Sequence, residues 1–268
     1  MLLKFNKQLN YNTENIITIK EINELIESDY IQEDIHNNHD GWFPLMKYDE
    51  DYGITKSFDA IQFLTVGLNP SLTNNFREHI HSTIFEIKDK FDPKSKHDFG
   101  RKDKYVIDKE AITKKLIDYQ ALLKYDNKEQ IPYFKHLKSF FEDINKEISF
   151  KDHVFHYDFC QLRHTNSKEI TNILNDKYEY FAKHFNKIIE AVNAEYIFVF
   201  NASLSRLLID KDFFSSKTIH KESGCYYLKD KPGSSPKVIL ANQLSGGATS
   251  SVYKELLIWN VNRIINKQ

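Results

Sequence analysis

Four short apolar segments punctuate the chain, and between them apolar residues recur every three or four positions. Each segment is rich in Ile, Val, Phe or Leu and runs into a loop with Gly, Asn or Ser. That pattern is typical of strands buried on both faces of a parallel sheet. The predicted strands are Ile61–Val66, His153–Phe159, Glu195–Phe200 and Lys237–Ala241.

The intervals between these segments show helical periodicity, with each apolar set on one face. Strands that alternate with helices predict βαβ crossovers and a parallel sheet covered on both sides, that is, a three-layer α/β sandwich with a central four-stranded parallel sheet. Such sheets bind ligands at the carboxyl ends of their strands. An earlier helix is expected over about Ile16 to Ile26. The helical sets are Ile112, Leu116, Ile117 and Leu123; Phe134, Leu137, Phe141, Ile144 and Ile148; Tyr178, Phe181, Phe185, Ile188, Ile189 and Val192; and Val252, Leu256, Trp259, Ile264 and Ile265.

No internal repeat and no Pro/Gly/Ser-rich linker divides the 268 residues, so we predict one domain over 1–268. Residues 1–55 form an N-terminal extension to the predicted sheet, and 77–130 form a long insertion. Within the insertion, Lys88–Lys104 holds seven basic and four acidic residues, a local balance of about +3. This stretch is either a solvated surface loop or an arm that contacts phosphates.

Composition narrows the class of protein only slightly. The net charge of −1 lacks the basic excess of many DNA-binding proteins, although a local basic groove is enough for a compact enzyme. Two cysteines, Cys160 and Cys225, exclude a disulfide framework and a four-cysteine cluster. With neither a signal-peptide run nor an apolar span in the sequence, we expect a cytoplasmic protein without a membrane segment. We further expect a monomer that uses no metal or cofactor.

Two loops hold the candidate chemistry. The first strand leads into Gly67-Leu68-Asn69-Pro70-Ser71, where glycine allows close backbone approach and proline fixes the turn. Asn69 is thus presented either to a ligand or as a structural cap. After the last strand, the small residues of 242–251 can approach a phosphate backbone closely, or simply connect to a capped helix.

Together, the two loops resemble motifs of the uracil-DNA glycosylase superfamily. Gly67–Ser71 is similar to the first motif of its mismatch-specific uracil/thymine branch, commonly Gly, an apolar residue, Asn, Pro and Gly. Leu240–Gly246 is similar to the second motif, in which a strand ends in Asn or His before a small, Ser-containing loop that enters the DNA. The family fold is a four-stranded parallel sheet between helices. From Ile61 to Ile265 the resemblance concerns the order of strands and helices. Individual residues match only in the two loops.

The resemblance implies base flipping followed by cleavage of the N-glycosidic bond, which builds positive charge on the sugar. Asn69 matches the position that holds the attacking water, and its neutral amide would contribute orientation. Neither loop contains a lysine, so a Schiff-base mechanism is not indicated. We therefore predict a monofunctional DNA N-glycosylase that leaves an abasic site.

Further candidate site residues lie in the segments that follow the predicted strands, each with a structural alternative. Asp158 and Asn201 are expected to contact the base, but an ion pair and a helix cap are the alternatives. Phe76 is the candidate for stacking on the base, in competition with His79 and His81. His153, His156 and His164 fit no common metal site and are interpreted as core or surface histidines. The expected base contacts are Gly67, Leu68, Phe76, Asp158 and Asn201, and the expected DNA contacts are Pro70, Ser71, Asn242, Leu244 (as a wedge, or an ordinary core leucine), Ser245, Gly246 and Gly247.

Departures from the family pattern bear on the substrate. Ser71 replaces the common glycine, and Ala241 and Gln243 stand where the family often has proline or serine. We hypothesise that the target is a bulkier modified base than uracil, such as those of phage DNA, which suggests antiphage defence. The main alternative is a non-catalytic nucleic-acid-binding protein on the same fold. A nucleotide-binding enzyme is less favoured, because no Gly-rich phosphate loop follows Val66.

Overall fold

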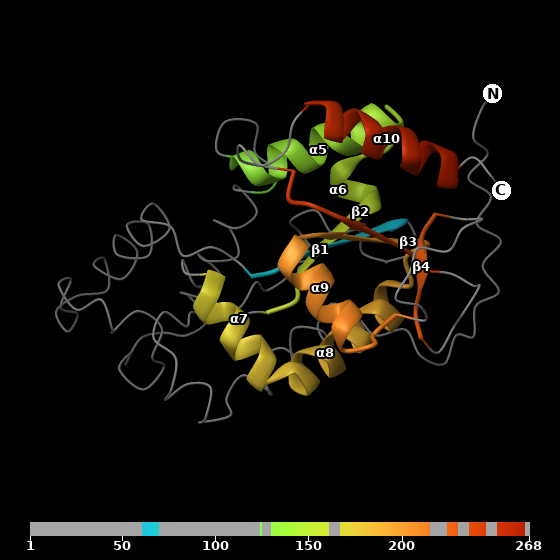
Figure 1. Ribbon diagram of the computed structural model, residues 1–268. Coiled ribbons are helices and arrows are strands. Elements are labelled where there is room, and N and C mark those ends of the chain that lie inside the picture. Colours follow the sequence, from blue (N-terminus) through green and yellow to red (C-terminus); the bar gives the residue numbers. More distant parts are fainter. Residues whose placement is uncertain are drawn as a thin grey trace, which may run out of the picture.

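The computed structural model describes residues 61–69, 124, 130–160, 167–214, 224–229, 236–244 and 251–265, which form an α/β arrangement with helices on both faces of a sheet (Figure 1). In chain order the elements are β1 (Phe63–Gly67), α5 (Pro132–Ile144), α6 (Phe150–His153), β2 (Val154–Asp158), α7 (Ser167–Asp176), α8 (Tyr178–Val192), β3 (Tyr196–Phe200), α9 (Ala202–Asp210), β4 (Tyr226–Tyr227), β5 (Lys237–Ala241) and α10 (Ser251–Ile265).

The sheet has the order β2-β1-β3-β5-β4. The four predicted strands are all present and pair in parallel, which confirms the α/β prediction. The expected number of strands was too low, because β4 pairs antiparallel with β5 at the edge of the sheet. A strand of two residues, Tyr226 and Tyr227, is too short to show a period of two, so the sequence pattern did not reveal it.

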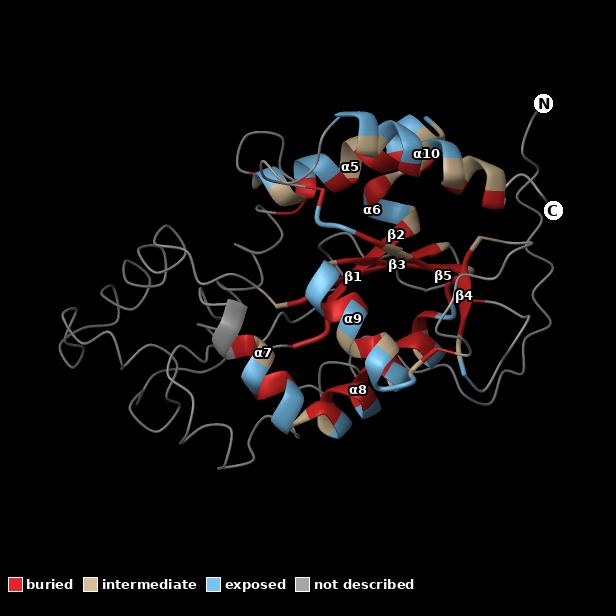
Figure 2. Cartoon of the chain, in the orientation of Figure 1, coloured by how far each residue is buried: buried red, intermediate tan, exposed pale blue. Residues whose placement is uncertain are grey.

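The two faces of the sheet have separate cores, which we call the α5 face and the α8 face (Figure 2). Side chains of β1 alternate between them: Leu64 and Val66 join the α8 face, and Phe63 joins the α5 face. The α5 face is aromatic near Phe63, whose ring centroid lies 5.1 Å from that of Phe141. Further along β1 the same face passes through Thr65 to Gly67. The side chains of β1 therefore become smaller toward its carboxyl end.

Two of the predicted helices are confirmed together with their buried faces. All apolar residues of the set from Tyr178 to Val192 are buried in α8, which ends where Asn193 adopts a left-handed conformation with φ of 46°. In α5, proline stands at the first helical turn, and Phe134, Leu137 and Phe141 are buried. The helix ends at Ile144, because Asn145 is extended, so the buried Ile148 lies beyond it.

The predicted face of the C-terminal helix was largely wrong. In α10, Val252, Leu256 and Trp259 are 61%, 60% and 64% exposed, whereas Leu257, Val261 and Ile264 are buried. The helix has apolar residues on more than one face, so periodicity alone selects no single stripe. Contact with α5 decides which stripe is covered, as the layer above the sheet in Figure 1 shows.

Three described helices, α6, α7 and α9, were not predicted, because they are short or interrupted by polar residues. Several predictions lie outside the described residues: the helix near Ile16 to Ile26, the extension 1–55, the stretch Lys88–Lys104, and the helix of Ile112 to Leu123. Of the insertion 77–130, Lys124 and Gln130 are described. Within the described residues, no helix has the length and apolar character needed to cross a membrane.

Candidate functional site

Strand polarity gathers the candidate residues at one edge of the sheet. Because β2, β1, β3 and β5 are parallel, their carboxyl ends point the same way, toward the left of Figure 1. Asn69, Asn201 and Asn242 each follow one of these strands. The strands β1 and β5 are separated only by β3, so they stand about 10 Å apart. The loops that begin with Asn69 and Asn242 therefore start at the same edge, as the sequence predicts.

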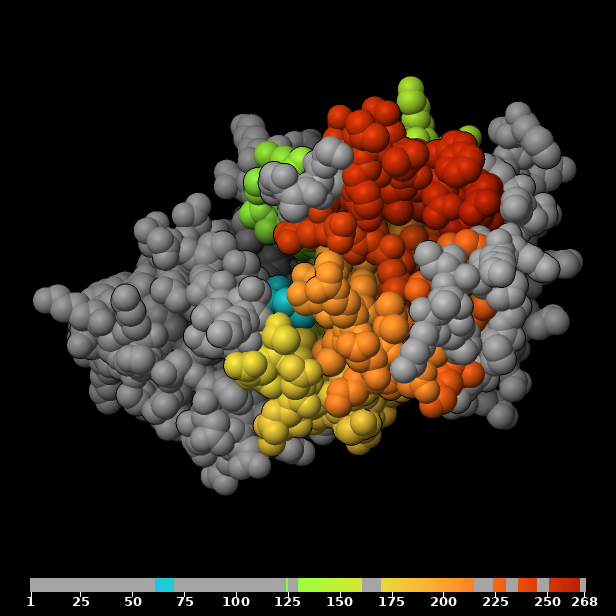
Figure 3. Space-filling view, viewed as in Figure 1, coloured from blue at the N-terminus to red at the C-terminus, as the bar shows by residue number. Residues whose placement is uncertain are grey.

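The neighbouring strands β1 and β3 form a switch point in the topology. The described helices between β1 and β2 lie on the α5 face, whereas α9, which follows β3, lies on the opposite face. Crevices that bind ligands occur at such switch points, outside the carboxyl ends of the strands. In Figure 3 part of the segment 61–69, in cyan, reaches the surface in a recess between α7 and α9.

At the end of β1, Gly67 makes room for the carboxylate of Asp158. The two residues are register partners in the pairing of β1 with β2. A Cβ atom on Gly67 would lie 2.2 Å from Oδ1 of Asp158 and 3.3 Å from Cε1 of His156. A separation of 2.2 Å is a severe clash, so glycine is required for this carboxylate to lie across β1. The sequence alone explained Gly67 by the approach of a ligand.

Behind Asp158 lies a buried chain of polar groups that connects β1 and β2. The Nε2 atom of His156 is 3.5 Å from Oδ1 of Asp158. Its Nδ1 atom is 2.9 Å from Oγ1 of Thr65, which also lies 3.3 Å from the carbonyl oxygen of Phe155. Thr65, His156 and Asp158 are at most 4% exposed. Buried polar groups need such partners, because an unpaired one loses its hydration without compensation.

The imidazole of His156 is held in an apolar setting. The rings of Tyr133 and Phe134 approach it edge-on, with centroids at 5.4 and 5.2 Å. Burial lowers the pKa of His156 from its ordinary value of 6.5, and the positive charge of Lys124 lowers it further, against the opposing effect of Asp158. The ring is therefore neutral at pH 7, so one nitrogen donates a hydrogen bond and the other accepts one.

The position of Asp158 assigns the tautomer of this neutral ring. An Nε2 lone pair aimed at a carboxylate would be repelled, whereas an Nε2–H group donates to it. The proton of His156 then resides on Nε2, and Nδ1 accepts from the Thr65 hydroxyl. The Thr65 hydroxyl has a single proton, so in this tautomer it donates to Nδ1 at 2.9 Å and not to the more distant carbonyl oxygen of Phe155 at 3.3 Å. The hydrogen bonds then run in one direction, from Thr65 through His156 to Asp158.

A second polar group near Asp158 is the hydroxyl of Tyr133 on α5. Burial and the charge of Asp158 raise the pKa of Tyr133 well above its ordinary value of 10.0, so the hydroxyl keeps its proton. This buried oxygen has no hydrogen-bond partner within the described part of the chain. An unsatisfied buried hydroxyl costs free energy that a bound acceptor would recover.

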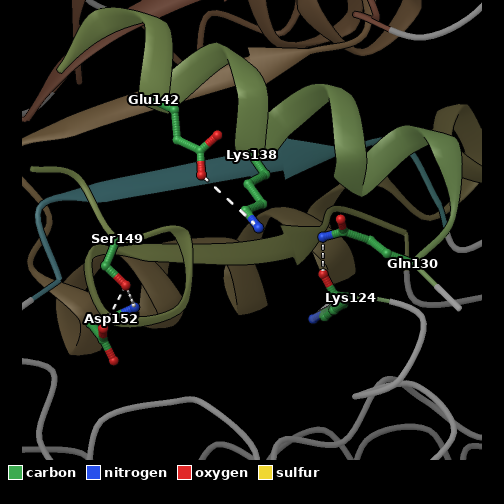
Figure 4. A network of polar contacts seen from close by, with 6 residues as sticks. All are labelled: Lys124, Gln130, Lys138, Glu142, Ser149 and Asp152. Carbon is green, nitrogen blue, oxygen red and sulfur yellow. Dashed lines mark hydrogen bonds and ion pairs between the residues drawn. The ribbon is translucent and has the colours of Figure 1, made fainter. Parts of the chain in front are cut away.

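Short polar contacts position the elements around this cluster (Figure 4). The side-chain amide of Gln130, just before α5, donates to the carbonyl oxygen of Lys124. The Lys124 ammonium lies 5.6 Å from the ring centroid of Phe134. At the start of α6, the Ser149 hydroxyl accepts from the backbone N–H of Asp152 and so caps the helix that leads into β2.

For several candidate residues, the structure shows whether the side chain has the structural role that was the alternative to ligand contact. The Oδ1 atom of Asn201 accepts from the backbone N–H of Leu204 at 2.9 Å, which confirms it as the N-cap of α9. Leu244 is 6% exposed and belongs to the α5-face core, as the alternative of a core leucine predicts. Asn242 is exposed, and its backbone N–H donates to the Tyr253 hydroxyl at 2.9 Å. Pro70, Ser71, Phe76, His79, His81, Arg163, His164, Ser245, Gly246 and Gly247 lie outside the described residues.

Sequence reasoning missed Thr65 and Tyr133 and interpreted His156 only as a core or surface histidine. The structure confirms that His156 is buried, and adds that it lies between a hydroxyl and a carboxylate. A signal was present in the sequence: Thr65 interrupts one apolar strand, and His156 and Asp158 interrupt the other with a period of two. Polar residues on one face of a buried strand indicate a network or a site.

Comparison of the sequence with protein-family profiles and with curated proteins finds no match. Among the described residues, no group of three or more His, Cys, Asp or Glu side chains has the arrangement of a metal site. Cys160 and Cys225 are both buried, in the cores on opposite faces of the sheet.

Proposed function

We propose that this protein is a monofunctional DNA glycosylase on a uracil-DNA glycosylase-like sandwich, acting in the cytoplasm as a monomer. It would hydrolyse the N-glycosidic bond of a flipped base and leave an abasic site. The observation that supports this most is the parallel order β2-β1-β3-β5, which brings Gly67-Leu68-Asn69, Asp158 and Asn242 to one edge of the sheet. Two loops far apart in the sequence thus begin at the same edge of the sheet, with only β3 between their strands.

In this mechanism the flipped nucleotide enters the crevice at the switch point between β1 and β3. Asn69 is the second residue after β1 and is half-buried, so it lies near the carboxyl edge of the sheet. The amide orients water against the anomeric carbon. Gly67, Leu68 and Asp158 form the floor beneath the base, and Asn201 lies at the entrance to α9, where its side chain also caps the helix.

The segment after β5 is the proposed contact with the DNA backbone. Asn242 is exposed, and the hydrogen bond from its N–H to Tyr253 ties the start of this loop to α10. A loop with an anchored start and small residues suits close approach to phosphates. Leu244 is packed in the core here, so a role as a wedge would need it to leave that core on DNA binding.

The proposed substrate is a modified base larger than uracil, and the proposed setting is defence against phage DNA. Support for this comes from the sequence, since Ser71, Ala241 and Gln243 depart from the uracil-specific pattern. Specificity for a base depends on which groups the pocket leaves unpaired when a wrong base enters.

A base-release assay tests the proposal. Purified protein is incubated with duplexes that contain uracil, a G·T mismatch or a hypermodified pyrimidine, and abasic sites are measured. We expect release from at least one duplex, and a loss of about 100-fold in Asn69→Ala with DNA binding retained. The control is Asn145→Ala, at the end of α5, where the side chain accepts only from the nearby N–H of Glu147.

Two results would contradict the proposal in different ways. Binding of DNA without release from any duplex would instead support the non-catalytic nucleic-acid-binding protein on the same fold. Neither binding nor release would remove both functions.

A further inference from the structure

We propose that Asp158 is the catalytic carboxylate of this site, which accepts a proton from the attacking water, and that His156 and Thr65 hold it in position. This inference rests on the proposed glycosidic hydrolysis. It gives Asp158 a role beyond contact with the base and adds two positioning residues on β1 and β2.

The location of Asp158 supports this role. Among the buried residues of the described chain, it is the one carboxylate. It ends β2 beside Gly67, and Gly67 is two residues before Asn69, the proposed water-orienting amide. The missing side chain at Gly67 leaves room for Oδ1 across β1, at the carboxyl edge of the sheet. A residue with a Cβ at position 67 would exclude the carboxylate from this place.

The hydrogen-bond chain explains how the carboxylate is oriented. Thr65 donates to Nδ1 of His156 at 2.9 Å, and the Nε2–H group faces Oδ1 at 3.5 Å. The second distance is long for a hydrogen bond, but catalytic hydrogen bonds often tighten only when substrate binds. A neutral ring in this tautomer steers the carboxylate without giving it a proton.

The reaction needs a group that Asn69 does not supply, because an amide is not a base at neutral pH. The water oxygen forms a bond to the anomeric carbon while the bond from that carbon to the base nitrogen breaks, and the electron pair leaves with the base. One water proton passes to Asp158, and the departing base takes up a proton from solvent. The negative carboxylate also stabilises the positive charge that develops on the sugar.

The Tyr133 hydroxyl is an independent observation that a ligand belongs here. It is buried, it lies close enough to Asp158 for the carboxylate charge to raise its pKa, and it has no partner in the described part of the structure. The Asp158 carboxylate is a buried acceptor and the Tyr133 hydroxyl is a buried donor. Together they match a substrate that offers both a donor and an acceptor. Among the described residues, the titratable and charged groups that act on Asp158 and its hydrogen-bonded neighbour include His156 on β2, Tyr133 on α5 and Lys124.

Single-turnover base release measured against pH tests the assignment. For the full chain we expect a rate that rises with pH to a plateau, as is typical of general-base catalysis. Asp158→Asn should lower the plateau by about 100-fold or more and remove the pH dependence. The matched control is Asp176→Asn, an exposed carboxylate at the end of α7, which should leave rate and profile unchanged.

The positioning residues are tested by a pair of variants at Thr65. Thr65→Val keeps the shape but loses the hydroxyl, and we expect about a tenfold slower release with an altered pH profile. Thr65→Ser keeps the hydroxyl and should restore the wild-type profile. A merely structural role would make the two variants differ in thermal stability without a change in the shape of the profile.

The possible outcomes separate the two proposals. If the wild-type protein releases no base from any duplex, both proposals are overturned. If it releases base and Asp158→Asn does so within about threefold of the wild type with an unchanged profile, the role of Asp158 alone is overturned. Should Asp158→Asn fail to fold, equal profiles for Thr65→Val and Thr65→Ser would overturn the hydrogen-bond chain.

Discussion

Gly67 and Asp158 are register partners at the carboxyl ends of β1 and β2, and a Cβ atom on the glycine would lie 2.2 Å from the aspartate Oδ1. The clash falls on a buried carboxylate that also faces His156, so the side chain has little freedom to withdraw. The close approach makes Gly67 a structural requirement of the polar cluster, in addition to any contact with a ligand.

The first prediction concerns this glycine. Gly67→Ala should lower the free energy of unfolding by about 1–3 kcal/mol, because an added methyl group overpacks the site, and it should abolish base release. Urea unfolding and the release assay measure the two effects. In the double variant Gly67→Ala with Asp158→Ala, the clash disappears, so the two losses of stability should sum to more than the loss in the double variant. If the two losses of stability are strictly additive, the added methyl group does not clash with the Asp158 carboxylate.

A second prediction follows from the lowered pKa of His156. In the unfolded chain its imidazole takes up a proton near the ordinary value of 6.5, but in the folded protein it does so only at lower pH. Between these pKa values the unfolded state binds more protons, so the stability contributed by the neutral ring is present above pH 6.5 and decreases as pH falls below it. The slope is at most about 1.4 kcal/mol per pH unit.

Urea titrations from pH 8 down to about pH 5 measure this effect, as the difference between wild type and His156→Gln. The difference curve should slope below pH 6.5. The matched control is His136→Gln on the exposed side of α5, which removes an imidazole without touching the polar cluster. Equal slopes for the two variants would mean that His156 is not held neutral by its surroundings.

The third prediction separates the structural and functional roles of Asn201. Asn201→Ala should destabilise the protein by about 1 kcal/mol, because α9 loses its N-cap, while Asn201→Asp should keep the cap and the stability. If the amide contacts a base, Asn201→Asp should still alter base release, because a carboxylate cannot donate a hydrogen bond. Full activity in Asn201→Asp would limit this residue to capping.

The fourth prediction uses two adjacent leucines of α10. Leu257→Ala should lower the free energy of unfolding by about 2–5 kcal/mol, because Leu257 lies on the buried side of α10. Leu256 is 60% exposed, so Leu256→Ala should change stability by no more than about 0.5 kcal/mol. Thermal or urea unfolding of the two variants compares them directly. A larger loss of stability for Leu256→Ala than for Leu257→Ala would show that Leu256, and not Leu257, faces the core.

The sequence alone was sufficient for the four parallel strands and for the helical layers on either side of them. Ile61–Val66 and Glu195–Phe200 read as buried strands because a parallel sheet covered on both faces leaves few polar positions, and the segment ends were correct within a few residues. The face of α8 was also predictable, since its apolar residues form one stripe beside a polar face. These features depend on the spacing of apolar residues within one segment, which can be read directly from the sequence.

Only the tertiary structure decided which groups meet. The pairing register of β1 with β2 places Gly67 beside Asp158 and Thr65 beside His156. The residues of each pair are about 90 positions apart in the sequence, so no local sequence pattern reveals that they are neighbours. Packing on α5 likewise chose Leu257 over Leu256 in a helix whose own sequence allowed either. The sequence by itself determined the four parallel strands, the buried faces of α5 and α8, and the edge where the loops gather. Contacts between distant segments determined the polar cluster, because its atoms become neighbours only when the sheet forms.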